Sequence, residues 1–264
     1  MPPRSASADR SRRLLTWLAR PAVAVVVLVF WIGYVVLWDL PSYVLPHPFK
    51  VVSTFAKLAA AGVLARHALF TLQAVVLGFA LGTTAAIVLG TLISRSRFVE
   101  AVLRPYIVAS QTTPTLVLAP LFLVWFGFGI ASKVLIAALI CFFPLLVNVI
   151  IGFRSVGESE LRLFRALGAG AWQTFVHLQI PSALPFIFAG LRITSILAVI
   201  GAVVGEFVGS PAGLGYLAVT AAGNLDTEIL FSAVFSLMLM GLAFYLLVTL
   251  VERRVLFWHE SARR

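Results

Sequence analysis

Six apolar runs, each about as long as a membrane-spanning helix, occupy about half of this 264-residue sequence. A helix needs about 20 predominantly apolar residues to cross the hydrocarbon core of a bilayer. Hydrophobic residues make up 61% of the chain and charged residues only 11%, which excludes an ordinary soluble domain. The spans are predicted at 21–40, 67–93, 105–126, 133–152, 183–208 and 229–250. The predicted fold is therefore an all-α membrane protein with six transmembrane helices.

The positions of the positive charges predict the orientation of these spans. If the N-terminus is cytoplasmic, cytoplasmic segments hold 15 of the 20 Lys and Arg residues and external loops hold four, among them Lys133. Because cytoplasmic loops are enriched in Lys and Arg, both ends of the chain are predicted to be cytoplasmic. This topology accounts for the net charge of +10 without nucleic acid as a partner.

The chain divides into a membrane core with short flanking segments. Residues 1–20 and 251–264 are predicted to be basic cytoplasmic tails. The apolar run that follows the first tail is longer than the core of a signal peptide, so 21–66 is read as an uncleaved first span and an external interfacial helix. The core transmembrane domain is predicted over 67–250, with a cytoplasmic loop at about 153–182.

Motifs for catalysis are missing from the sequence. There is no phosphate-binding loop, no paired carboxylates and no Ser/His/Asp arrangement, so the chain is not predicted to be an enzyme or to hydrolyse ATP. Its four histidines are scattered and its one cysteine, Cys141, lies within an apolar run. We therefore predict neither a metal site nor a disulfide.

A few polar residues within the spans are candidates for a translocation path. In the third span Gln111, Thr112 and Thr113 precede Pro114, and the carbonyls that proline frees would suit such a path. A kink satisfied by neighbouring helices fits these residues equally well. In the fourth span Asn148 is the one strongly polar residue.

Two ionisable residues of the fifth span, Arg192 and Glu206, complete the candidate path. Arg192 could attract an anionic solute, but it could also cap a helix or pair with Glu206. A structural role is the alternative for both residues.

The polar segment from Glu158 to Arg192 lies between two predicted spans and faces the cytoplasm. Leu161, Phe164 and Leu167 form an apolar stripe on a short helix. The run 168–170 (Gly-Ala-Gly) predicts a turn into a second short helix, with Pro181 beginning the next element. Spans on both sides leave no room for the three-helix core of a DNA-binding domain, so no nucleic-acid partner is predicted.

This segment resembles the cytoplasmic signature of the integral membrane permeases of binding-protein-dependent ABC importers. The signature reads Glu-Ala-Ala, three residues, Gly, nine residues, Ile, one residue, Leu-Pro. With its glycine on Gly168, the closing part falls on Leu178, Ile180 and Pro181, a conservative match. The opening Glu-Ala-Ala falls on 162–164 and is not reproduced, and Glu160 is close enough to substitute for its glutamate.

Shorter motifs between residues 40 and 250 resemble the nitrate, sulfonate and taurine branch of that family, which also includes importers of pyrimidine precursors of thiamine. They are Leu45-Pro46-x-Pro48, Gly78-Phe79-x-Leu81-Gly82, Ala119-Pro120-Leu121, Trp125-Phe126-Gly127-x-Gly129, Ser132-Lys133, Phe143-Pro144, Gly190-Leu191-Arg192 and Gly213-Leu214-Gly215-Tyr216.

The resemblance implies the type I ABC importer permease fold in a multi-pass protein of the bacterial cytoplasmic (inner) membrane. Two copies of the chain would form the pore as a homodimer in lipid, with two cytoplasmic ATP-binding subunits beneath it and an external solute-binding protein delivering the cargo. The chain would bind no cofactor itself, since ATP and Mg belong to the partner subunit. The expected cargo is a small solute such as a sulfonate, nitrate or taurine, with a thiamine pyrimidine precursor as the alternative.

The resemblance also assigns a loop that couples the pore to the ATPase. Its residues would be Glu160, Arg162, Phe164, Leu167, Gly168, Trp172, Leu178, Ile180 and Pro181. The segments 41–66 and 209–227 are candidates for contact with the binding protein, although 213–216 is equally well read as a simple turn. The alternative function is a stand-alone six-span channel or secondary carrier, which would need no amphipathic cytoplasmic loop and would more often carry charges within its spans.

Overall fold

The computed structural model describes residues 22–23, 25–112 and 115–258, and the regular elements of these residues are all helices. A first helix spans Val25–Leu37. The others are α2 (Pro48–Ala60), α3 (Val63–Ser94), α4 (Arg97–Thr112), α5 (Thr115–Phe126), α6 (Ile130–Arg154), α7 (Glu158–Ala166), α8 (Ala171–Thr174), the π-helical turn η1 (Phe175–Gln179), α9 (Ile180–Val208), α10 (Leu214–Gly223) and α11 (Thr227–Val255).

Four helices of the described residues are long and apolar enough to cross a membrane. They are α3, α6, α11 and the continuous helix Ala171–Val208, which α8, η1 and α9 form together. Four of the predicted spans are thus confirmed as long apolar helices. The apolar helices at Val25–Leu37 and Val117–Phe126 are shorter, so the count of six spans and the cytoplasmic position of both ends stay predictions. The predicted tail 1–20 lies outside the described residues. Of the predicted tail 251–264 the structure describes 251–258, and 251–255 continue α11 as a helix.

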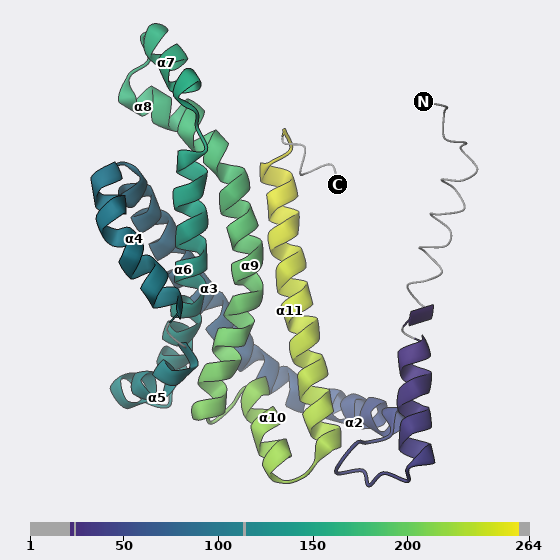
Figure 1. Ribbon diagram of the computed structural model, residues 1–264. Coiled ribbons are helices and arrows are strands. Elements are labelled where there is room, and N and C mark those ends of the chain that lie inside the picture. The colour runs from purple at the N-terminus through teal and green to yellow at the C-terminus, as the bar shows by residue number, and fades with distance from the viewer. Residues whose placement is uncertain (1–21, 24, 113–114, 259–264) are drawn as a thin grey trace, which may run out of the picture.

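The third predicted span differs from the structure. In place of one helix over 105–126 there are two, α4 and α5, and α5 lies across the direction of α4 (Figure 1). The sequence has Pro114 between the two helices, and a proline has no N–H to donate and disfavours helical geometry in the residue before it. Residues 113–114 themselves, including the candidate Thr113, lie outside the described residues.

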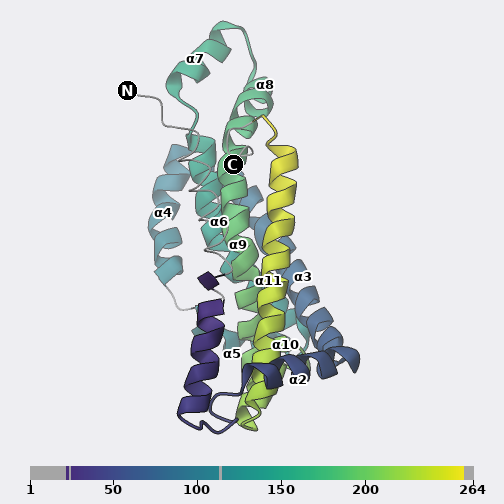
Figure 2. The ribbon, with the colours of Figure 1, turned by 90° about the vertical axis from the view of Figure 1, so that its right-hand side faces the viewer.

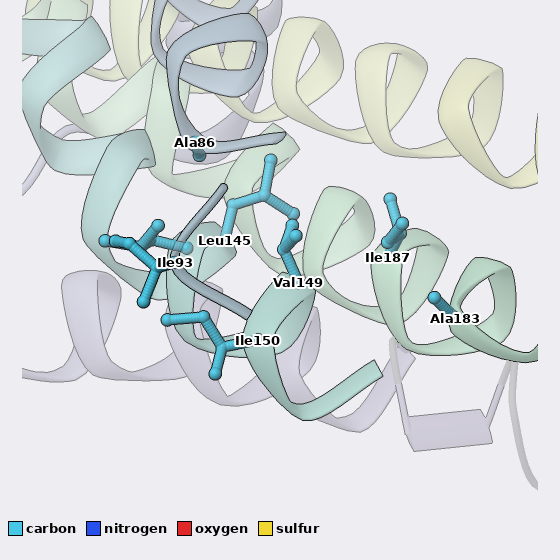
Figure 3. Close-up of a cluster of buried hydrophobic side chains, with 8 residues drawn as sticks. Ala86, Ile93, Leu145, Val149, Ile150, Ala183 and Ile187 are labelled. Atoms are coloured by element: carbon cyan, nitrogen blue, oxygen red, sulfur yellow. The ribbon is translucent and has the colours of Figure 1, made fainter. Parts of the chain in front are cut away.

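The core forms where α6 packs between α3 and α9. Side chains from these three helices gather in one buried apolar cluster, in which Leu145 and Val149 of α6 meet Ala86 of α3 and Ala183 of α9 (Figure 3). Small residues let the backbones approach closely. An added Cβ on Gly201 of α9 would lie 2.7 Å from the Cα of Ala137 on α6.

We expect Gly201→Val to push α6 and α9 apart and to destabilise the protein by about 1–3 kcal/mol, because overpacking forces backbone shifts. The measurement is thermal unfolding of the purified chain in detergent. Gly241→Ala on α11 is the matched control, since an added Cβ there has nothing within 4 Å. Equal melting temperatures for the two variants would contradict the close approach.

The segment predicted as an interfacial helix contains α2, which lies across the direction of the long helices (Figure 2). The hydroxyl of Thr54 donates a 2.8 Å hydrogen bond to Glu228 of α11, and Phe55 meets Phe235 edge-on with ring centroids 5.5 Å apart. The Gly62 backbone, at φ 73°, then turns the chain into α3. The α2 helix thus lies at the end of the long helices that is opposite α7 (Figure 1).

Candidate functional site

Residues 155–181, which we call the elbow segment, project beyond one end of the helical bundle (Figures 1 and 2). The segment consists of α7, a glycine turn and the first turns of the continuous helix that becomes α9. The segment joins the bundle where α6 ends and where α9 begins, and Arg95, just after α3, lies against its Phe175. No residue of α7 is buried, so the surface of α7 is open to a partner.

The turn of the elbow segment depends on Gly168. The Gly168 backbone has φ 76°, its N–H donates to the carbonyl of Arg165 at 3.0 Å, and the N–H of Ala169 donates to the carbonyl of Phe164 at 3.0 Å. These two bonds make a Schellman motif, in which a left-handed residue closes a helix. The predicted glycine turn between two helices is therefore confirmed.

As predicted, Pro181 lies at the start of the next element, because α9 begins at Ile180, but the second helix and α9 form one continuous helix with no break between them. It runs through η1, where the N–H of Ile180 reaches the carbonyl of Phe175, five residues back. A proline ring clashes with the carbonyl four residues earlier in a regular α-helix, and the wider π turn relieves that clash. A movement of the elbow segment would therefore reach α9 directly.

The outward apolar surface of the elbow segment differs from the predicted stripe. Leu161 and Phe164 are only partly exposed, whereas Leu167 is 74% and Trp172 is 70% exposed. The sequence analysis missed Leu163, which is 57% exposed and lies one turn before Leu167. The i,i+4 spacing of the two leucines was the signal available.

The remaining coupling candidates occupy two environments. Glu160 and Arg162 are exposed on α7, and Arg162 forms an i,i+4 ion pair with Glu158 at 3.0 Å. The other three, Leu178, Ile180 and Pro181, are partly buried where the helix enters the bundle. The two sets cannot make the same contact.

The path candidates of the third and fourth spans lie on α4 and α6. Gln111 and Thr112 are the last two residues of α4. The Asn148 amide, partly buried on α6, donates a 2.8 Å hydrogen bond to the carbonyl of Pro144 in the preceding turn. Their role in a path stays a prediction.

Arg192 and Glu206, the two ionisable candidates, do not pair with each other. The Arg192 Nε lies 3.2 Å from Oε2 of Glu252 on α11, and Glu252 is buried. The pairing with Glu206 considered from the sequence is therefore wrong, because Glu206 lies near the other end of α9, four turns away. Glu252 was missed because it lies just beyond the predicted sixth span.

Glu206 is buried, with 2% of its surface exposed, and both of its carboxylate oxygens accept hydrogen bonds. Oε1 accepts from the hydroxyl of Thr71 on α3 at 2.8 Å, and Oε2 accepts from the N–H of Gly215 in the first turn of α10 at 2.7 Å. The N–H of Leu214 donates to Thr71 and that of Gly213 to His67 Nδ1, at 2.8 and 3.1 Å. These residues, which we call the Glu206 network, tie the start of α10 to α3 and α9.

Lys133 lies beside this network and was wrongly counted as an external loop residue. It is fully buried in the first turn of α6, and its ammonium donates to the carbonyl of Phe128 at 2.8 Å and to that of Gly209. A buried ammonium needs such partners because desolvation of a charge is costly. The sequence marked this position only through the Ser132-Lys133 motif.

The arrangement combines long apolar helices with two polar features. Long apolar helices carry a projecting amphipathic segment at one end and a hydrogen-bonded polar network toward the other. In the described part of the chain, no group of three or more His, Cys, Asp and Glu side chains gathers where a metal could bind.

The chain belongs to the family of binding-protein-dependent transport system inner membrane components, whose profile matches residues 78–257. It is 39% identical to the riboflavin transport system permease protein of Chloroflexus aurantiacus, over 96% of this chain and 95% of that protein. It is 35% identical to the formylaminopyrimidine transport permease protein of Halalkalibacterium halodurans, over 88% of this chain and 95% of that protein.

More distant relatives agree on the family and the fold. Identity to the taurine transport system permease protein of Escherichia coli is 27%, over 90% of this chain and 88% of that protein. The crystal structure of an amino acid ABC transporter matches with a TM-score of 0.61 and 20% identity, over 75% of this chain and 97% of that chain. The family recognised from the motifs is thus confirmed, and the fold of the described residues is that of an ABC transporter permease.

Proposed function

We propose that the chain is the pore-forming permease subunit of an ATP-driven importer that receives its solute from an external binding protein. The observation that supports this most strongly is the elbow segment, an exposed amphipathic segment continuous with a spanning helix, in a chain of this family. In this proposal two copies form the pore in the bacterial inner membrane with both ends of each chain in the cytoplasm. Two ATP-binding subunits, which carry ATP and Mg, dock on the elbow segments.

The docking contact in this proposal is made by Leu163, Leu167 and Trp172. These apolar side chains are exposed together on the elbow segment. An amphipathic helix typically inserts such a face into a groove of its partner. Because Ala171–Val208 is one helix, closure of the ATP-binding subunits would move α9 and, through it, the Glu206 network.

For the cargo we propose a neutral or zwitterionic heterocycle in preference to the small anion expected from the sequence. Two observations support the change. The relatives named for riboflavin and formylaminopyrimidine transport are 39% and 35% identical to this chain, and one named for aliphatic sulfonates transport is 32% identical. The one cation that could have drawn an anion into the fifth span, Arg192, has its charge offset by Glu252. A sulfonate stays the second candidate, because the taurine permease is also a relative.

Uptake assays test both parts of this proposal. Cells that carry the gene should accumulate labelled riboflavin or formylaminopyrimidine, and cells from which it is deleted should not. Uptake should stop when ATP is depleted while the membrane potential is maintained. Taurine uptake that depends on the gene would replace the proposed cargo, and uptake that survives ATP depletion would favour the channel or secondary carrier.

A further inference from the structure

A cavity of about 730 Å³ lies between the elbow segment and the ends of α3 and α6. Polar and aromatic side chains line it together, including Ser94, Arg95, Phe153, Arg165, Phe175 and Gln179. None of Leu163, Leu167 and Trp172 lines it, so the proposed docking contact does not account for it.

Two arginines from different elements line this cavity. Arg95 follows the last residue of α3, and Arg165 lies in the last turn of α7. Within the described ranges neither has a carboxylate at ion-pair distance, whereas Arg154, Arg162 and Arg192 each have one. Two cations lining one cavity without a neighbouring acid disfavour each other, and an anion between them removes that cost.

Both arginines are exposed, and each guanidinium group has one contact with the protein. The Arg95 guanidinium carbon lies 5.0 Å from the centre of the Phe175 ring, and Phe175 stacks on Phe153 with centroids 5.8 Å apart and an 11° angle between the rings. The Arg165 Nε donates to the carbonyl of Leu161 at 3.2 Å. Arginine has five N–H donors in a rigid fork, so each group keeps donors for a ligand.

The cavity lies at the level where the long helices end. Arg95 is the C-cap of α3 and Phe153 is the next-to-last residue of α6. Arginine and aromatic residues at this level of a membrane protein face the phosphate groups of the lipid. Basic pockets between spans on the cytoplasmic side typically bind acidic lipid head groups.

We propose that this cavity is a binding site for a phosphate group, which Arg95 and Arg165 bind from two sides. The phosphate would belong to the head group of an anionic phospholipid or to a soluble phosphate. Bound there, it would bridge the end of α3 and the elbow segment. The assignment of this site to the cytoplasmic side of the membrane rests on the proposed function, and the site itself does not.

Native mass spectrometry of the full-length chain in detergent tests this site. The chain is mixed with phosphatidylglycerol, with phosphatidylcholine or with inorganic phosphate. The wild-type chain should retain phosphatidylglycerol in preference to phosphatidylcholine, and Arg95→Gln/Arg165→Gln should weaken that binding about tenfold or more, because each substitution removes a charge-assisted contact. Arg162→Gln is the matched control, since it removes the same charge from α7 outside the cavity.

The lipid and phosphate arms decide the source of the ligand. Inorganic phosphate that binds with the same dependence on the two arginines would identify a soluble phosphate. Binding that is equal in the double variant and the control, or that is found with neither ligand, would overturn the proposal. Because the chain is tested alone and without cargo, none of these results depends on ATP-driven import.

Discussion

Gly168→Val should abolish transport while leaving the amount of protein in the membrane unchanged. The Gly168 backbone has φ 76°, and an added Cβ would have nothing within 4 Å, so the effect comes from the backbone alone. A β-branched residue in left-handed geometry costs about 1–2 kcal/mol or more, and the Schellman turn would open to relieve it. The exposed leucines would then lose their position relative to α9. We expect uptake to fall by about tenfold or more and ATP hydrolysis to lose its dependence on the solute.

Two matched variants separate this geometry from a general effect of substitution in the loop. Gly168→Asn should keep most activity, because asparagine tolerates left-handed geometry. Gly170→Ala should also be tolerated, since Gly170 has φ −70° and only Gln173 lies near an added Cβ, at 3.9 Å. Normal transport by the valine variant would remove the elbow segment from the coupling mechanism.

Glu206→Leu should be among the most destabilising single substitutions in the chain. It removes the acceptor of the Gly215 N–H and the shorter hydrogen bond of the Thr71 hydroxyl, which keeps the carbonyl of His67 at 3.2 Å. A polar group left buried without a partner costs about 1–3 kcal/mol. It also leaves the Lys133 ammonium buried without a neighbouring carboxylate. The start of α10 should detach from α3 and α9, which thermal unfolding in detergent and proteolysis of the 209–213 loop would both detect.

Glu206→Gln distinguishes hydrogen bonding from charge in this network. The amide oxygen can still accept from one donor, so the variant should retain most of the stability that the leucine variant loses. If the two variants unfold at the same temperature, the negative charge beside Lys133 matters more than the hydrogen bonds. If neither differs from wild type, the Glu206 network does not hold α10.

One helix links the elbow segment to the Glu206 network. The helix begins at Ala171, within the elbow segment, and ends at Val208, two residues after Glu206. A helix of 38 residues is about 57 Å long at 1.5 Å per residue, so it is long enough to cross the hydrocarbon core of a bilayer and to project beyond it. This length explains how a contact at the elbow segment can act on α10 without a separate relay.

Much of the fold could be predicted from the sequence, because bilayer thickness fixes the length of apolar helices. The spans around α3, α6, α9 and α11 were placed correctly on hydropathy alone. The interruption of the third span was not predicted, since a proline inside an apolar run is compatible with either a kink or a break. The π turn before Pro181 could not be read from the sequence, because residue identity does not show how a helix accommodates a proline.

The candidate site was predicted less completely than the fold. Gly168 could be identified because a left-handed C-terminal residue has a strong sequence preference. The partners of the charged residues could not be identified, since Arg192 meets Glu252 and Glu206 meets Thr71 only through tertiary packing. Lys133 was misplaced because the positive-inside rule counts charges and does not detect burial.

Co-purification with the ATP-binding subunit tests the central claim most directly. The tagged chain would be extracted in detergent from its native cells, in wild-type form and as Leu163→Glu/Leu167→Glu. Val52→Glu is the matched control, since Val52 is 66% exposed on α2 at the opposite end of the molecule. We expect the wild type and the control to recover an ATP-binding subunit and the double variant to recover none. Equal recovery by all three forms, or recovery by none, would contradict docking through the elbow segment.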